Sequence, residues 1–316
     1  GAGISRAIGQ GKDADVSALK ELSAELAVLR QQYPDRVDIR IFQSIIATSL
    51  GQPEQAEQEL KLAIDECKEP LKAEMQLIRH YIAAKRVKDA IGVCEAACKR
   101  HEDAAEPWAA LSDLYVMQQD YESARRSLQQ GLDIAEDRRV KRSVSTKLAV
   151  LELSHGDRSA GIDLLKELAN DPQEVQARLL LLGTREIRDD PNATERLISE
   201  LRKAEGESGL WWRLYQASIW LSGPEAAAKH KDITALLEYC VNADPTWPAP
   251  VLLLAEACAQ QGDSARAEGI YRQSLLANPS ATQVGEQLLG LLTRQGRYAD
   301  AEKVLRQIQN PRIAAD

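Results

Sequence analysis

Apolar residues recur along this chain at the spacing of amphipathic helices, and the helices recur at a nearly constant interval. Nine marker residues define this interval: Leu22, Ala56, Ala90, Ala124, Gly161, Leu197, Ile233, Ala267 and Ala301. The steps between them are 34 residues near both ends of the chain and 34 to 37 residues in the middle. An interval of this length predicts a repeat protein in which each repeat is one supersecondary unit.

The residues after each marker predict one helix per repeat. The position four residues beyond the marker is apolar or aromatic in every repeat: Leu26, Leu60, Cys94, Leu128, Leu165, Leu201, Leu237, Tyr271 and Leu305. The position seven residues beyond the marker continues the same helical face. Each marker is therefore predicted to open a helix whose apolar side packs against a neighbour.

Residues that permit sharp turns stand at regular places around these helices. Five residues before a marker stand residues that tolerate a left-handed backbone: Gly51, Gly156, Asn192, Gly262 and Gly296. Just past the predicted helices stand prolines, which end one helix and start the next: Pro34, Pro172, Pro245 and Pro279. The predicted repeat is a first helix, a tight turn, a second helix that carries the marker, and a short loop.

The stretch WAALSDLYVMQQDYESARRSLQQG, residues 108–131, contains every part of this repeat. It resembles the signature of the tetratricopeptide repeat (TPR) at six positions: Trp108, Leu111, Ser112, Tyr115, Tyr121 and Ala124. The segments VLLLAEACAQQGDSARAEGIYRQSLLANP and QLLGLLTRQGRYADAEKVLRQI match it comparably. The resemblance implies an all-α, right-handed superhelix of antiparallel helix pairs, with a concave groove lined by first helices.

We expect one continuous solenoid of about nine helix-pair repeats. Residues 1–136 hold regular repeats with a partial first unit, residues 137–246 hold irregular, lengthened repeats, and residues 247–316 are regular again. The last second helix keeps apolar Val304, Leu305 and Ile308, although a solenoid normally ends in a polar cap. Because the chain also starts with Gly1, we interpret it as a piece of a longer protein. Further repeats, or self-association with a second copy, would cover the apolar end.

Charge and composition narrow the range of partners. The formal net charge of −8 disfavours nucleic acid and anionic membrane surfaces. No apolar run approaches the roughly 18 residues of a membrane span, so we expect no membrane insertion. Five cysteines, an odd number in a chain too large to need disulfides, favour a reducing compartment such as the cytoplasm. The sequence leaves a periplasmic or membrane-anchored parent open.

Motifs for catalysis or metal binding are few and incomplete in this sequence. GQGK at residues 9–12 lacks the spacing of a phosphate loop, and GESG at residues 206–209 lacks that of a nucleophile elbow. The histidines stand singly: His80, His101, His155 and His230. Cys94 and Cys98 lie one helical turn apart, but Cys94, Cys240 and Cys258 fall on apolar slots of the repeat, which favours core packing. We expect no catalytic residue, no metal and no cofactor.

A basic segment and an aromatic segment are candidate contact sites. The basic segment RRVKRSVSTK contains Arg138, Arg139, Lys141 and Arg142, which either form a solvated helix face or anchor an acidic peptide. The aromatic segment LWWRLYQASIW places Trp211, Trp212 and Tyr215 on one side of a helix and Trp220 almost opposite. One of these sides either contacts a partner or packs against the insertion near GPEAAAKHKD.

Two uses of TPR arrays can be compared with this chain. Chaperone-binding TPR modules hold a peptide carboxylate with Lys and Asn on successive first helices, whereas this chain offers Lys72 and Arg79 but no asparagine there. Glycosyltransferase-associated arrays carry an asparagine ladder along the groove, whereas the asparagines here fall at loops or helix ends. Lys72 and Arg79 remain candidates for peptide contacts.

These observations predict a non-catalytic scaffold that binds a protein or peptide in its concave groove. The alternative is a regulatory or substrate-recruiting arm of a larger enzyme whose catalytic domain lies outside this sequence. A flanking catalytic motif would favour the arm, and further repeats or a membrane anchor would favour the scaffold.

Overall fold

The computed structural model describes residues 16–309, in which the chain is helical without any β-strand. Within this range nine helices carry the markers and are second helices: α2 (Val16–Gln32), α4 (Pro53–Glu66), α6 (Val87–Arg100), α8 (Tyr121–Ile134), α10 (Arg158–Ala169), α13 (Pro191–Glu205), α15 (His230–Ala243), α17 (Ser264–Ala277) and α19 (Tyr298–Gln309). The first helices are α3 (Val37–Ser49), α5 (Pro70–Ala83), α7 (Ala105–Met117), α9 (Arg138–His155), α11 (Val175–Gly183), α14 (Trp211–Ser222), α16 (Pro248–Gln260) and α18 (Thr282–Arg294). The short α12 (Arg185–Arg188) follows α11. The GQGK segment and Asn310 lie outside the described residues.

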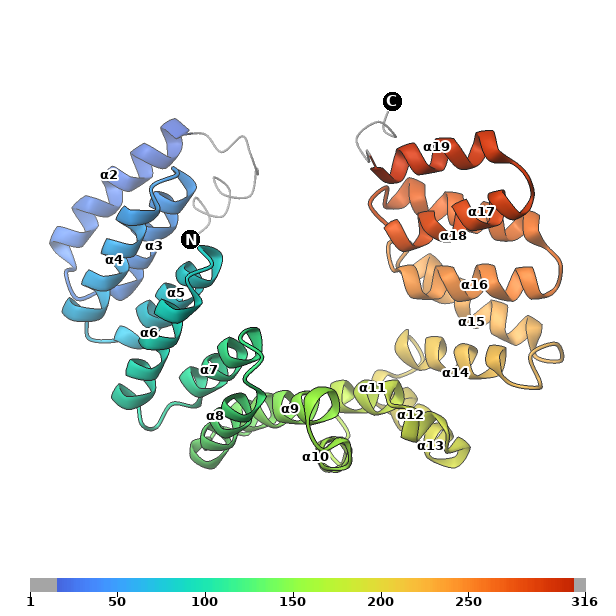
Figure 1. Ribbon diagram of the computed structural model, residues 1–316, viewed down its shortest axis with the longest axis horizontal. Coiled ribbons are helices and arrows are strands. Elements are labelled where there is room, and N and C mark those ends of the chain that lie inside the picture. Colours follow the sequence, from blue (N-terminus) through green and yellow to red (C-terminus); the bar gives the residue numbers. More distant parts are fainter. Residues whose placement is uncertain (1–15, 310–316) are drawn as a thin grey trace. The chain divides into compact units, whose positions relative to one another are not determined.

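The chain divides into two compact units, residues 1–164 (unit 1) and residues 165–316 (unit 2). Within each unit first and second helices alternate, and each helix packs mainly against its neighbours in sequence (Figure 1). This is the predicted all-α arrangement of stacked helix pairs. None of the described helices combines the length and the apolar character needed to cross a membrane.

The marker residues lie where paired helices approach most closely. Ala56, Ala90 and Ala124 are completely buried. At Gly161 even a methyl group would lie 2.8 Å from the backbone oxygen of Ala149 on α9, so this marker requires glycine. In these four repeats the small marker therefore sets the distance between the helices of a pair.

The register predicted for α13 is wrong by three residues. The marker is the fourth residue of α4, α6, α8 and most other second helices, and that place in α13 belongs to Thr194 rather than to Leu197. Leu197 is buried as predicted, together with Thr194, Ile198 and Leu201, whereas Ala204, which the predicted register placed on the buried face, is exposed. Thr194 is polar although this place in the repeat is buried. Its hydroxyl tolerates burial because it donates to the backbone oxygen of Ile187 at 2.6 Å.

The predicted turns are confirmed in part. Gly51, Gly262 and Gly296 have the left-handed backbone with φ between 72° and 81°. Gly156 is extended at φ −136°, and Asn192 lies inside α13 just after Pro191, so neither forms the predicted left-handed turn. The same left-handed position is taken by two residues that the sequence did not suggest, Lys85 (φ 59°) and Gln119 (φ 62°).

Three repeats place a charged side chain at one and the same buried position of the stack. Sixteen residues before the marker, where the TPR signature and Trp108 have an aromatic ring, stand Arg40, Glu74 and Arg178, all buried. Arg40 pairs with Glu59 at 3.0 Å and with Glu66, and Glu74 pairs with Arg100 and, at 2.7 Å, with His101. Arg178 donates to four backbone oxygens at the end of α10 and in the following loop, those of Ala169, Asp171, Pro172 and Glu174. Each buried charge therefore has partners that offset part of its desolvation cost, although the Nε of Arg40 is buried without a hydrogen bond.

The last described helix is less apolar on its surface than its sequence indicated. Val304 is buried, and Ile308 fills the space beside Gly285, where a methyl group would lie 2.6 Å from its side chain. Of the three apolar residues noted above, only Leu305 is exposed, at 40%. Self-association through this helix stays a prediction.

The two non-glycine turns give a test of the backbone argument. We expect Lys85→Gly and Gln119→Gly each to raise the free energy of unfolding by about 0.5–1 kcal/mol, because a side chain costs roughly 1–2 kcal/mol in the left-handed region and glycine's extra chain entropy offsets part of this gain. Urea unfolding followed by circular dichroism measures the change. The neighbouring Ala84→Gly and Gln118→Gly, at φ −79° and −88°, are the controls and should destabilise the protein. Equal destabilisation by all four changes would contradict the argument.

Candidate interaction surface

The first helices of unit 1 present an exposed row of side chains. Eleven residues before the markers Ala90, Ala124 and Gly161 stand Arg79 on α5, Asp113 on α7 and Val150 on α9. All three are exposed, on the side of each first helix that does not carry its buried residues. We call this side of α5, α7 and α9 the first-helix face of unit 1.

An ion pair ties two helices of this face together. The ammonium group of Lys147 on α9 lies 2.6 Å from the carboxylate of Asp113 on α7. Val116 and Met117 follow Asp113 by one helical turn, and Val150 follows Lys147 by one turn. First helices run in the same direction, so these three side chains gather beside the ion pair. Val116 is 37% exposed, Met117 53% and Val150 41%, and together they form the apolar patch.

Lys72 and Arg79, the two candidate contact residues on α5, differ in their surroundings. Lys72 pairs with Glu69 at 3.2 Å and approaches Asp38 at 3.9 Å. Arg79 is exposed and has no acidic partner within the described residues. Its charge therefore stays available to a ligand, whereas that of Lys72 is largely neutralised.

The basic segment lies at the start of α9. Asp137 accepts hydrogen bonds from the backbone N–H groups of Arg139 and Val140 and caps the helix. These bonds lower the pKa of the Asp137 carboxyl group below its usual value. Arg138, Arg139 and Lys141 are exposed, and Arg142 is half-buried. The segment is thus a cationic border of the first-helix face, and its role in binding stays a prediction.

The predicted aromatic residues of α14 lie in unit 2 and serve mostly packing. Trp212 is buried between the guanidinium groups of Arg202 and Arg213, and its indole N–H donates to the backbone oxygen of Gly206 at 3.2 Å. The Tyr215 hydroxyl donates to the backbone oxygen of Leu179 at 3.4 Å, and burial raises its pKa.

Trp211 and Trp220 lie nearer the surface. Trp211 is partly exposed and packs edge-on against Trp247, at 4.6 Å between ring centroids. Trp220 is half-buried under the ammonium group of Lys229, so it packs against the insertion that precedes α15. Trp220 also lines a hollow of about 660 Å³ beside α12 and α13. Of the four predicted aromatic residues, Trp211 is the most exposed, at 38%.

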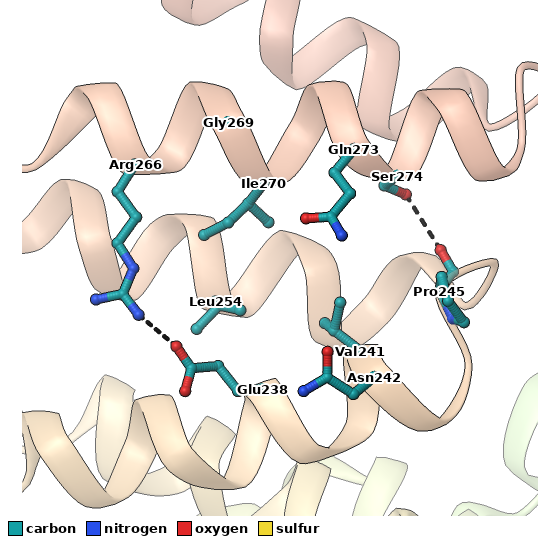
Figure 2. A pocket seen from close by; sticks show the side chains of 10 residues that line it. All are labelled: Glu238, Val241, Asn242, Pro245, Leu254, Arg266, Gly269, Ile270, Gln273 and Ser274. Carbon is teal, nitrogen blue, oxygen red and sulfur yellow. Dashed lines mark hydrogen bonds and ion pairs between the residues drawn. The ribbon is translucent and has the colours of Figure 1, made fainter.

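Three hollows recur at one place in the stack. Each lies between two successive second helices over the intervening first helix, with volumes of about 450 Å³ (α4 and α6), 370 Å³ (α6 and α8) and 550 Å³ (α15 and α17). Figure 2 shows the last of these, where Arg266 reaches towards Glu238 and the Ser274 hydroxyl donates to the backbone oxygen of Pro245. Corresponding residues line all three hollows, whereas their polar groups differ. The hollows therefore reflect the geometry of stacking.

A four-residue ion network appears once in each unit. In unit 1 Glu57 accepts from Lys61, Tyr81 and Arg86, and Arg86 also reaches Asp89. In unit 2 the same places are held by Glu268, Arg272, Arg297 and Asp300. Each network joins a second helix to the turn of the next repeat, and Arg297 lowers the pKa of the Glu268 carboxyl group.

In the described part of the chain the two neighbouring thiols, Cys94 and Cys98, contact each other inside the core. The five cysteines are buried and unpaired, as the core-packing interpretation predicted. Cys94 donates to the backbone oxygen of Pro107 at 3.1 Å. No group of three or more His, Cys, Asp or Glu residues in the described range could hold a metal ion.

The residues that distinguish the first-helix face were not predicted as contact sites from the sequence. Asp113, Val116, Met117 and Val150 stand in or beside stretches that were interpreted as structural. No position rule identifies them, because Val116, Met117 and Val150 stand eight, seven and eleven residues before their markers and Ile82, also eight before its marker, packs against the core.

Comparisons with known proteins agree with this architecture. Residues 81–145 and residues 252–316 each match a family model described as tetratricopeptide repeat. The search of curated proteins found no significant match.

Two crystal structures show a similar arrangement of helices. A tetratricopeptide repeat protein from Parabacteroides merdae ATCC 43184 is 14% identical with a TM-score of 0.54, and the match covers 81% of this chain and 98% of that one. Yeast Tom70 is 16% identical with a TM-score of 0.58, and the match covers 97% of this chain and 63% of that one. At this low identity the likeness concerns the fold alone.

The network around Glu57 predicts how stability changes in acid. Burial raises the pKa of the Glu57 carboxyl group, but the bonds from Lys61, Tyr81 and Arg86 outweigh burial and lower the pKa from 4.5 to about 2. A carboxyl group with a depressed folded pKa stabilises the protein above its unfolded pKa and loses this effect as the pH falls through the folded value. We therefore expect Glu57→Gln to lower the urea midpoint near neutral pH, with a difference from wild type that shrinks between pH 4.5 and 2. Glu102→Gln, at an exposed residue outside any network, is the control, and a difference independent of pH would contradict this interpretation.

Proposed function

Because the chain is an array of tetratricopeptide repeats, we propose that it is a non-catalytic scaffold that binds a protein or peptide segment on the first-helix face of unit 1. The observation that carries this proposal is the apolar patch of Val116, Met117 and Val150. Isolated exposed apolar residues are common, but three that adjoin across two helices, rimmed by charges, are typical of a contact surface. The fold supports the same class of function, because stacked repeats offer an extended surface to a partner.

The charges on this face favour a polypeptide over nucleic acid. Cationic Arg79 and Lys147 alternate with Asp113, and Lys147 is already paired with that carboxylate. A nucleic-acid surface would need a row of cations that follows the phosphate backbone. The mixture of apolar side chains with separate charges suits a peptide, whose side chains differ from position to position.

A capture experiment tests this proposal. We expect the wild-type chain to retain a partner from an extract of its source organism and Met117→Asp to lose it, with affinity at least about tenfold lower, because a carboxylate in the apolar patch is desolvated by the bound partner. Quantitative mass spectrometry of the retained proteins measures the difference. Leu276→Asp, at an exposed leucine of α17, is the matched control and should retain the same partner. Equal retention by all three proteins would show that the first-helix face is not the binding surface.

A further inference from the structure

The first-helix face has one open positive charge beside one apolar patch. Resting on the proposed function, we infer that it binds an extended peptide segment carrying an acidic residue about four positions from a large apolar residue. The acidic side chain contacts Arg79, and the apolar side chain sits on Val116, Met117 and Val150.

Arg79 is the residue of this face that selects for an acid. Its neighbour on the row, Asp113, is neutralised by Lys147 at 2.6 Å. At the equivalent place on α3 stands Ile45, so no acidic residue faces Arg79 from the preceding repeat. The exposed acid of α7, Glu106, lies two helical turns before Asp113, at the level of Lys72 rather than of Arg79. An arginine left open in this way binds a carboxylate through two parallel hydrogen bonds.

The apolar patch fixes the other end of the segment. Val116 and Met117 belong to α7 and Val150 belongs to α9, so the patch spans two successive first helices. Ile82, the equivalent of Val116 on α5, is half-buried and continues the apolar floor towards Arg79. A leucine-sized side chain on this patch would cover the exposed parts of all three residues.

The distance between helices sets the spacing in the peptide. Side chains of an extended peptide point alternately to opposite sides, so two residues that contact one face stand an even number of positions apart. Four positions span about 13 Å, which suits a step from Arg79 on α5 to the next first helix and one helical turn along it. An acid directly next to the apolar residue would point away from the face.

Synthetic probes test the charge and the spacing. The reference probe is a fluorescein-labelled Gly/Ser peptide with one Asp and one Leu about four positions apart, so that both side chains point to the same side. Three variants replace Asp by Lys, replace Leu by Ser, or move Asp next to Leu. Fluorescence anisotropy with the wild-type protein should show binding of the reference probe and about tenfold weaker binding of each variant.

Charge reversal in the protein provides the decisive comparison. Arg79→Glu should prefer the Lys probe to the Asp probe, which reverses the wild-type order. Arg126→Glu, at an exposed arginine of the second helix α8, carries the same change of charge and should keep the wild-type order. Circular dichroism of both variants confirms that they are folded.

The outcomes separate this inference from the proposed function. An unchanged order in Arg79→Glu, or failure of the wild type to bind the reference probe, overturns the inference, while the capture of a partner that depends on Met117 would still support the scaffold. Probe binding that is unaffected by Met117→Asp overturns the inference and counts against the first-helix face as well. If light scattering showed instead that the wild-type chain dimerises and that Met117→Asp is monomeric, the patch would belong to a second copy of the chain and the inference would be wrong.

Discussion

Close approach at the marker residue is the constraint on which the rest of this structure depends. A helix pair of about 34 residues cannot bury its own apolar side, so it is stable only against its neighbours. The buried alanines Ala56, Ala90 and Ala124, and Gly161 with its contact to the backbone of α9, let neighbouring helices come together. A bulky side chain in place of one of these small markers would separate its pair, whereas α14 and α15 are packed around Ile233 at the same place.

The stack tolerates large changes of chemistry elsewhere provided that each buried group is satisfied. Trp108, Glu74 and Arg178 hold the same place in their repeats, although one is aromatic and the others carry opposite charges. Glu74 meets Arg100 and His101, while Arg178 binds backbone oxygens at the end of the preceding helix. Such a substitution keeps the helices in place because hydrogen bonds replace the apolar contacts that the ring would make.

These two properties explain which parts of the fold were predictable. Small and apolar residues at a regular interval identify the second helices, because only packing requires them there. Thr194 was missed because a threonine that bonds to Ile187 is buried without being apolar. Lys85 and Gln119 were missed because the stack imposes their left-handed backbone against their own preference. Arg79 was named from its charge, whereas Met117 and Val150 belong to an exposed surface on which the repeat pattern places no requirement.

The side chains of the first-helix face are free of the packing constraint, so they differ from repeat to repeat without changing the fold. Arg79, Asp113 and Val150 occupy one position in three successive repeats, yet they are a cation, an anion and an apolar residue. Since the marker fixes the spacing of the helices, each repeat adds one side chain at a set distance along the face. A ligand on this face would therefore contact one such side chain in each repeat. The specificity of that binding would depend on the order of unlike side chains along the face. Because packing constrains only the buried positions of each repeat, the order of exposed side chains on this face does not affect the fold.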